Sequence, residues 1–419
     1  MFEFAVRLCI FEDYRYRYFL PLTYTRPVFQ LRYGSITMLQ YVAKALGMKP
    51  EMVICRELVA KKASWLYPEI QVNRAIQDDV REFLFVNCRV IPSKRDLYQI
   101  LDLGPGEFLQ AEDTIYAFRP KNKEELDRVR KSMFKPLECK PNANMREIKY
   151  YWDLIAVFEN ALKETVKCKE VEFKEANVIA EGTSGLHVGK DTKFYGHIFI
   201  DCTKGPVFIG RNVRLGHGTT IEGPAYIGSN TYIMPSTRLS TCYIGSVCRV
   251  GGEVECSIVE AYTNKYHYGF LGHSYVGSWV NIGAGTTTSD LKNTYGTIRV
   301  YLGSKRVETG LIKLGACIGD HSKTSIGCLI YSGISIGTAS HVHGIVTRNV
   351  PPFTMFLEGI GAKNIELNLK SAILTYRRMC KRRDVEPSTA EEEILWNVFE
   401  MTSTERRKMG IMKGKITLP

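Results

Sequence analysis

Residues 209–239 read IGRNVRLGHGTTIEGPAYIGSNTYIMPSTRL, and an aliphatic residue returns at every sixth position of this stretch. The series is Ile209, Leu215, Ile221, Ile227, Ile233 and Leu239. An amphipathic helix would need apolar spacings of three and four, and an exposed strand would need a spacing of two. A period of six is typical of a triangular coil in which each flat side turns one aliphatic residue into a shared prism. The stretch therefore predicts a left-handed parallel β-helix.

The repeat extends on both sides of this stretch, and we expect the β-helix to cover residues 186–352. Further inward positions are predicted at Ile244, Val250 and Cys256, at Val276, Ile282 and Thr288, and at Ile318, Thr324, Ile330, Ile336 and Val342. Residues 260–272 and 290–313 interrupt the stepping, so we expect both segments to loop out of the prism. Loops on a rigid scaffold are common places for functional sites.

The two flanks of the repeat have other patterns. Strand-like runs at 4–11, 52–55 and 83–90 alternate with helical stretches at 36–44, 124–132 and 149–164, which predicts an α/β domain with a mainly parallel sheet. Residues 101–118 are expected to form a hairpin or other strand structure with turns at 104–106. After the repeat, residues 363–383 and 386–402 predict two helices. We expect three domains: a nucleotidyltransferase-like α/β domain over 1–165, the β-helix over 166–355, and a basic helical extension over 356–419.

Composition restricts the class of protein. The net charge of +12 is concentrated in part in the C-terminal extension, and no nucleic-acid-binding motif accompanies it, so we do not expect nucleic acid as the main partner. A basic surface also suits phosphorylated sugars, nucleotides and coenzyme A. No apolar run is long enough for a membrane helix, and no signal peptide is expected. The 12 cysteines are scattered without metal-ligand spacing, which indicates reduced thiols and a cytoplasmic protein.

The segment 264–286, NKYHYGFLGHSYVGSWVNIGAGT, carries a family resemblance. It resembles the acetyltransferase half of bifunctional enzymes that join a glucosamine-1-phosphate acetyltransferase to an N-acetylglucosamine-1-phosphate uridylyltransferase. The likeness covers roughly residues 1–355 and includes a divergent branch of sugar nucleotidyltransferases that carries PLTYTRPV (21–28), GFLGHSY (269–275) and SDLKN (289–293).

The resemblance implies roles for several residues of the β-helix. His267 takes the place of the catalytic base, which removes a proton from the attacking amine. Glu253 takes the place of the carboxylate that orients this base, and Asn281 that of a sugar-contacting asparagine. The backbone of Gly283, Ala284 and Gly285 would approach the acyl donor, acetyl-CoA. His273 is a rival base for which a structural role is the stronger reading.

One position departs from the family pattern. The family has a lysine two residues after the orienting glutamate, where it meets the substrate phosphate, and Glu255 stands there in this chain. Two like charges repel, so a sugar phosphate is not expected to bind there in the same way. Lys265 is the candidate substitute, or the acceptor is a different amino sugar.

The N-terminal domain resembles a pyrophosphorylase with substitutions. Pro21, Leu22, Thr23 and Pro27 match the family motif, but Val28 replaces its lysine, and EDYRYR (12–17) replaces its glycine-rich phosphate loop. Side chains in that loop obstruct the backbone N–H groups that cradle phosphates. Arg89 stands where the family delivers a magnesium-binding aspartate, so the metal ligands are left open. Arg26, Arg32 and Asn87 are the candidate contacts to nucleotide and sugar phosphate.

Three functions follow from this reading. The preferred one is a cytoplasmic, homotrimeric transferase of nucleotide-sugar synthesis that uses acetyl-CoA, a nucleoside triphosphate with Mg²⁺, and a sugar phosphate. The second is nucleotidyl transfer alone, with the β-helix used for assembly. The third is a non-catalytic trimeric scaffold with a degenerate nucleotidyltransferase domain.

Overall fold

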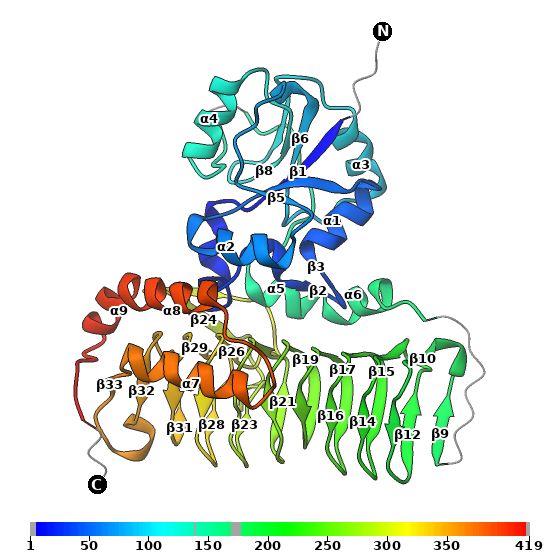
Figure 1. Cartoon of the computed structure of the whole chain (residues 1–419), viewed down its shortest axis with the longest axis vertical. Helices are drawn as coiled ribbons and strands as arrows, with labels where there is room; N and C mark the ends of the chain where they lie inside the picture. The colour runs from blue at the N-terminus through cyan, green and yellow to red at the C-terminus, as the bar shows by residue number, and fades with distance from the viewer. Residues whose placement is uncertain (1–5, 138–139, 169–176, 416–419) are drawn as a thin grey trace. The chain divides into compact units, whose positions relative to one another are not determined.

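A computed structural model describes residues 6–137, 140–168 and 177–415. The chain divides into two compact units, Met1–Asp153 and Leu154–Pro419. The first contains a mixed sheet with helices, and the second contains a long stack of coils followed by helices (Figure 1). The fold class predicted from the sequence is therefore confirmed.

The sheet of the first unit is built around β1 (Arg7–Phe11). Its strand order is β5-β4-β1-β6-β8-β7, and β1 runs parallel to β4 and β6. The predicted hairpin at 101–118 is present, because β7 and β8 are antiparallel to each other. The remaining strands are β4 (Pro50–Ile54), β5 (Gln71–Val72), β6 (Phe83–Asn87), β7 (Phe108–Gln110) and β8 (Ile115–Phe118). Residues 4 and 5 of the predicted first strand lie outside the described residues.

Some helices of this region begin at polar caps. Thr37 and Gln40 form a reciprocal capping box at the start of α1 (Met38–Leu46), and Asn122 accepts a hydrogen bond from the backbone at the start of α4 (Lys123–Lys131). These caps satisfy N–H groups that have no partner within the helix. The other helices up to residue 165 are α2 (Glu57–Leu66), α3 (Lys94–Leu101), α5 (Tyr151–Ala156) and α6 (Phe158–Thr165). The predicted helix at 149–164 is thus divided into two.

The second unit is a parallel β-helix, as the period of six predicted. Its strands pair with the equivalent strands of the next coil in parallel, which is the pattern of a left-handed hexapeptide β-helix. One face consists of β11 (Lys193–Phe194), β14 (Arg214–Leu215), β16 (Tyr232–Ile233), β18 (Arg249–Val250) and β20 (Asn264–Lys265), and it resumes with β27 (Lys323–Thr324), β30 (His341–Val342) and β32 (Thr354–Phe356).

The other strands of the coils form the remaining faces. They are β9 (Val178–Glu181), β10 (Leu186–Val188), β12 (Ile198–Asp201), β13 (Val207–Ile209), β15 (Thr220–Ile227), β17 (Arg238–Ile244), β19 (Glu253–Val259), β21 (Phe270–Gly272), β22 (Tyr275–Val276), β23 (Thr287–Thr288), β26 (Cys317–Ile318), β28 (Leu329–Ile330), β29 (Ser335–Ile336) and β31 (Ile345–Val346). Each of β15, β17 and β19 is long enough to turn a corner between two faces.

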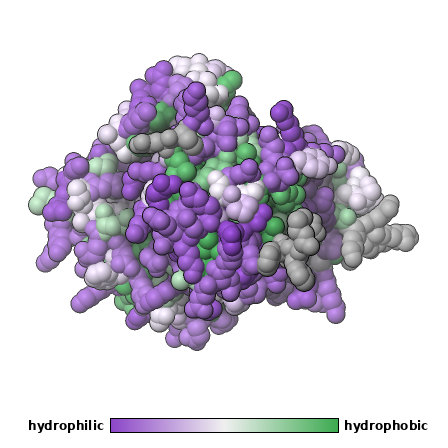
Figure 2. All heavy atoms as spheres, turned by 90° about the horizontal axis from the view of Figure 1, so that it is seen from above, coloured by the Kyte–Doolittle hydropathy of each residue, from purple (hydrophilic) through white to green (hydrophobic). Residues whose placement is uncertain are grey.

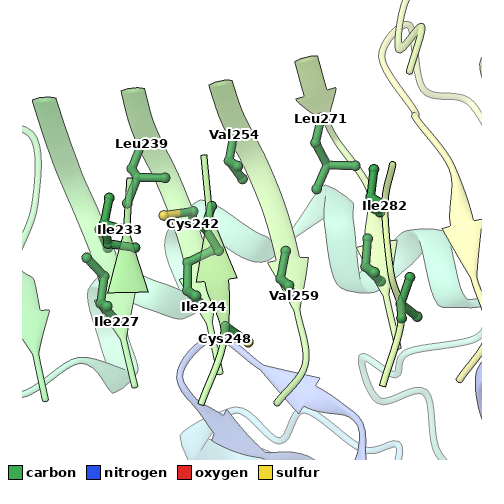
Figure 3. Packing of buried hydrophobic residues seen from close by; sticks show 14 of the residues in the cluster. Ile227, Ile233, Leu239, Cys242, Ile244, Cys248, Val254, Val259, Leu271 and Ile282 are labelled. Carbon is green, nitrogen blue, oxygen red and sulfur yellow. The ribbon is translucent and has the colours of Figure 1, made fainter. Parts of the chain in front are cut away.

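The prism core is a set of columns of inward side chains (Figure 3). In one column Leu215 lies against Ile233, then Val250, then Lys265. Each of these aliphatic residues is fully buried, which is worth about 1.5–3 kcal/mol per side chain relative to exposure. The column continues through Ile282, Thr324 and Val342. A lysine therefore occupies one layer of an otherwise apolar column.

One of the two predicted interruptions is wrong. Residues 260–272 do not loop out, since β20 and β21 pair in register with the preceding coil. The inward positions there are Val254, Val259, Lys265 and Leu271. Some corners between them contain fewer residues than a regular coil, so successive inward positions are not always six residues apart. Cys256, which was predicted to face inward, instead lies at a corner with a left-handed φ of 44° and is partly exposed.

The second predicted interruption is confirmed. Residues 290–313 leave the coil and contain the antiparallel hairpin of β24 (Arg299–Leu302) and β25 (Lys305–Glu308). An antiparallel bridge between Leu291 and Lys313 closes the neck of this excursion. The coil resumes beyond it, where Cys317 pairs with Tyr275.

Helices follow the β-helix, as predicted. They are α7 (Leu369–Lys381), α8 (Thr389–Met401) and α9 (Ser403–Lys408), after a short strand β33 (Ile365–Glu366). Buried polar contacts hold them in place: Nε2 of His321, at the start of a coil, lies 2.8 Å from the Glu391 carboxylate of α8, and Nε of Arg406 on α9 forms an ion pair at 2.9 Å with Glu366 on β33. Most of the surface in Figure 2 is hydrophilic, and none of the helices in the described part of the chain could cross a membrane.

Basic side chains meet on the face near the end of the stack. Lys323 and His341 are register partners on β27 and β30, and His343 lies two residues further along. Burial, together with the neighbouring Lys323 and His343, lowers the pKa of His341 to about 4. The imidazole is therefore neutral in the folded protein at neutral pH.

The lowered pKa of His341 predicts that the stability of the protein depends on pH. An imidazole in the unfolded chain titrates near a pKa of about 6.5, so the unfolded state binds the proton more readily than the folded state. The part of the unfolding free energy that depends on a neutral His341 is fully present above a pH of about 6.5. It is lost as the pH falls toward 4. We expect the wild type to lose about 2–3 kcal/mol more unfolding free energy between pH 7 and pH 4 than His341→Gln loses. Urea unfolding at both pH values measures this difference. His197→Gln, at an exposed histidine, is the control and should behave as the wild type; equal losses in all three proteins would contradict the prediction.

Candidate functional site

The His267 corner lies between β20 and β21. The His267 side chain is exposed to solvent, and its ring contacts that of Tyr266 with 5.0 Å between centroids. Lys265 supports this corner from inside the prism: its Nζ donates to the carbonyls of Gly251 at 2.6 Å and Gly269 at 2.7 Å, and lies 3.5 Å from the carbonyl of His267. Burial lowers the pKa of Lys265 to about 8, against the opposing effect of Glu253. Lys265 thus holds the corner that carries His267.

Glu253 has a different partner from the one expected. Its carboxylate forms an ion pair with Arg238 at 3.5 Å, and its side chain is 42% exposed. In the part of the chain that the structure describes, no hydrogen bond joins Glu253 to His267. The two residues belong to successive coils, because Glu253 pairs in register with Phe270, three residues after His267. The orienting role of Glu253 stays a prediction.

The glycine-rich segment after Asn281 is shaped by the next coil. A side chain at Gly283 would come within 2.3 Å of the Ser325 carbonyl, so close coil stacking accounts for this glycine. The Gly283 N–H donates to the Thr324 hydroxyl at 2.8 Å, and the Gly285 N–H donates to the Tyr268 carbonyl at 3.2 Å. The N–H of Ala284 has no such partner among the described residues.

Asn281 lies in a pocket that the sequence did not reveal. The Asn264 amide donates to Oδ1 of Asn281 at 2.8 Å, and the two asparagines form part of the wall of a cavity of about 100 Å³. We call this cavity the arginine pocket; it is lined by Arg249, Tyr262, Asn264, Trp279, Asn281, Met379, Arg382 and Arg383. Its residues come from the coils and from the end of α7. No local motif marks it, because Arg249 is more than a hundred residues away in sequence from the adjacent Arg382 and Arg383.

A histidine–carboxylate pair exists in the β-helix, but at His273 and not at His267. Nδ1 of His273 lies 2.7 Å from Oδ2 of Asp290, and both side chains are mostly buried. Burial acts to raise the pKa of Asp290, but the hydrogen bond and charge of His273 bring it below its ordinary value. Close by, Glu255 forms an ion pair with Lys313 at 3.3 Å. The His273–Asp290 pair connects the start of the 290–313 excursion to a corner of the coil, which agrees with a structural role for His273.

In the N-terminal unit, Asn87 and Arg89 belong to a buried network around Asp13. The Asn87 amide donates to Asp13 at 2.9 Å, and Arg89 forms ion pairs with Asp13 and with Glu147. The side chains of Arg89 and Asp13 are fully buried. Burying a charge is costly unless it is paired, and here every charge has a partner. Asn87, predicted to contact substrate, is fully buried and supports this network.

A second buried pair occupies the start of the replaced phosphate loop. One oxygen of Glu12 accepts from Nε of Arg56 at 2.7 Å, and the other accepts from the backbone of Val28 at 2.6 Å. The loop itself forms the 3₁₀ helix η1 (Tyr14–Phe19). Of the two arginines predicted to bind phosphates, Arg26 is buried and Arg32 is partly exposed.

The chemistry of these residues does not fit the expected magnesium site. The place of the metal-binding aspartate holds the guanidinium of Arg89, and the nearby carboxylates of Asp13 and Glu147 are neutralised by it. Among the described residues no group of His, Cys, Asp or Glu side chains is arranged to hold a metal ion. We therefore derive no step through a metal at this position.

Comparison with known proteins agrees with this two-part organisation. Residues 8–170 match the model of the family described as sugar nucleotidyl transferase. The chain is 32% identical over 190 residues to the bifunctional protein GlmU of Prochlorococcus marinus (strain MIT 9211), covering 40% of this chain and 38% of that protein. It is 34% identical over 157 residues to a bifunctional sugar-1-phosphate nucleotidylyltransferase/acetyltransferase of Sulfurisphaera tokodaii, covering 35% of this chain and 38% of that protein.

A solved structure is also similar. The UDP-N-acetylglucosamine acyltransferase of Francisella novicida matches with a TM-score of 0.31 and 14% identity, covering 57% of this chain and 93% of that chain. The two curated relatives are matched over 38% of their own length. Over part of its length the chain is thus similar to bifunctional sugar-1-phosphate nucleotidylyltransferase/acetyltransferases, and its residues 8–170 match the sugar nucleotidyl transferase family.

Proposed function

We propose that this protein is a transferase of nucleotide-sugar synthesis whose β-helix transfers an acetyl group from acetyl-CoA to the amino group of an amino-sugar phosphate. The observation that carries the proposal is an exposed histidine at a coil corner that a buried lysine holds in place, within the segment that resembles the acetyltransferases. A homotrimer is part of the proposal, because in the resembling enzymes the acyl donor lies between subunits.

The proposed step needs a base near the amine. The amine nitrogen attacks the thioester carbonyl, its proton passes to the imidazole of His267, and the carbon–sulfur bond breaks to release coenzyme A. The open N–H of Ala284 supplies a hydrogen bond to the acyl group, and Asn281 contacts the sugar. Exposure of His267 supports this role, since a base must reach a diffusing substrate.

Removing the base tests this proposal. We expect His267→Ala to lower the rate of coenzyme A release from acetyl-CoA and an amino-sugar phosphate by about a hundredfold or more. The control is His197→Ala, because His197 is also exposed and occupies the same corner of an earlier coil, between β11 and β12. A His267→Ala protein as active as the wild type would refute acetyl transfer at this corner.

Lys265 is proposed to position His267 and not to contact the substrate. Its Nζ donates hydrogen bonds to backbone carbonyls inside the prism. Lys265→Met should remove these bonds from the His267 corner and still fill the column, because the two side chains are of similar length. We expect kcat to fall about tenfold with little change in KM or in melting temperature. Ile233→Met, in the same column, should leave kcat unchanged. An effect of Lys265→Met on KM alone would instead indicate a direct substrate contact.

The family match over residues 8–170 supports a second activity, the transfer of a nucleotidyl group to a sugar 1-phosphate. In this proposal Arg32 binds a phosphate of the nucleotide or the sugar as a bidentate donor. The buried pairs Glu12–Arg56 and Asp13–Arg89 replace the usual glycine-rich cradle, so the phosphates must bind differently in this chain.

Pyrophosphate release from a panel of nucleoside triphosphates with sugar 1-phosphates tests this activity. We expect release by the wild type and by His267→Ala, and a rate about tenfold lower in Arg32→Gln because a charge-assisted hydrogen bond is lost. Arg81→Gln, at an exposed arginine paired with Asp79, is the matched control. If the wild type releases no pyrophosphate in any combination, the unit keeps the fold without the activity.

A further inference from the structure

The arginine pocket gathers positive charges that have no counter-charge. Arg249 comes from β18, Arg382 ends α7, and Arg383 follows it. Among the described residues none of these arginines forms an ion pair or a side-chain hydrogen bond. The fully buried Arg89 and Arg406, in contrast, each have carboxylate partners. The pocket arginines are less buried than these, since Arg382 is exposed and Arg249 and Arg383 are partly exposed, yet all three converge without a carboxylate.

The arrangement is electrostatically unfavourable in the absence of a ligand. Nε of Arg383 is buried and makes no hydrogen bond. Burial lowers the pKa of Arg383, and the charges of Arg249 and Arg382 lower it further. The negative end of the α7 dipole favours one cation at this place, but it does not explain the convergence with Arg249 from another element. An unsatisfied buried donor and mutually repelling cations both cost free energy.

The walls of the pocket suit a small anion. Its volume of about 100 Å³ is below the roughly 300 Å³ of a typical ligand site, so one group of a ligand fits and a whole sugar nucleotide does not. The rings of Tyr262 and Trp279, which also line the pocket, stack with centroids 4.3 Å apart. The amide of Asn281 adds a hydrogen-bonding group.

We propose that the arginine pocket binds the phosphate group of a small-molecule substrate and that α7 completes this site. Guanidinium groups match the oxygens of a phosphate with paired hydrogen bonds, and Nε of Arg383 would gain its missing partner. The pocket would replace the phosphate-binding lysine of the resembling family, since Glu255 stands at that position and is paired with Lys313. The assignment of the phosphate to a transferase substrate rests on the proposed function, whereas the anion site itself does not.

Phosphate binding can be measured without turnover. Titration of the full chain with inorganic phosphate should change the emission of Trp279 and raise the melting temperature by about 2–4 °C at saturation, because the ligand removes the repulsion between the arginines. The double variant Arg382→Gln/Arg383→Gln should bind phosphate about tenfold to a hundredfold more weakly. Without phosphate it should melt no lower than the wild type. Arg378→Gln, which removes an exposed charge from the same helix, is the matched control and should bind as the wild type does.

Two further comparisons identify the source of the phosphate. Glucosamine 1-phosphate compared with glucosamine tests the sugar phosphate, and coenzyme A compared with 3′-dephospho-coenzyme A tests the acyl donor. Preference for a phosphorylated member, lost in the double variant, supports the proposal and names the ligand. Equal phosphate affinity in the wild type and the double variant would overturn it. This outcome is separate from failure of the proposed function, because acetyl transfer can then still depend on His267.

Discussion

Each coil of the β-helix must place its inward side chains directly against those of the coil before it. The columns that result, such as Leu215, Ile233 and Val250, are fully buried and fix the register of every strand beside them. Because a one-residue shift on a face would turn core residues outward, differences in length have to be taken up at corners. The His267 corner, the Cys256 corner and the 290–313 excursion all lie where a face ends. The position of the candidate site is therefore a consequence of how the core is filled.

The chain arranges its clustered charges in two different ways. In the N-terminal unit, Glu12 and Asp13 each face an arginine, and the pairs are sealed from solvent. Such pairs specify one arrangement of the chain but leave no charge available to a ligand. In the arginine pocket, the cations converge without a carboxylate. The contrast separates charges that serve the fold from charges that are available for binding.

The sequence predicted the architecture well because the period of six directly reflects the inward positions of the coils. It failed at 260–272, where the short corners after Val250 change the spacing and Lys265 stands at an inward position. A lysine there carries no hydrophobic signal, yet its carbonyl partners keep it inside the prism. The arginine pocket could not be predicted, since its parts meet only when α7 packs on the coils. His273 and Asp290 are 17 residues apart, a spacing that has meaning only once coil lengths are known.

The hairpin excursion shows how such a scaffold can acquire new parts. The chain leaves the coil at Asp290 and returns at Leu314, and these two residues are joined by a backbone hydrogen bond of 2.8 Å. The bridge between Leu291 and Lys313 brings both ends of the excursion to one point, so its length is not constrained by the stacking of the coils on either side. Adding residues to a loop whose ends are already fixed costs little free energy. The neck thus works as an insertion point: during evolution, segments of different length and sequence can be exchanged there, and recognition can change while the columns of the prism are inherited unaltered.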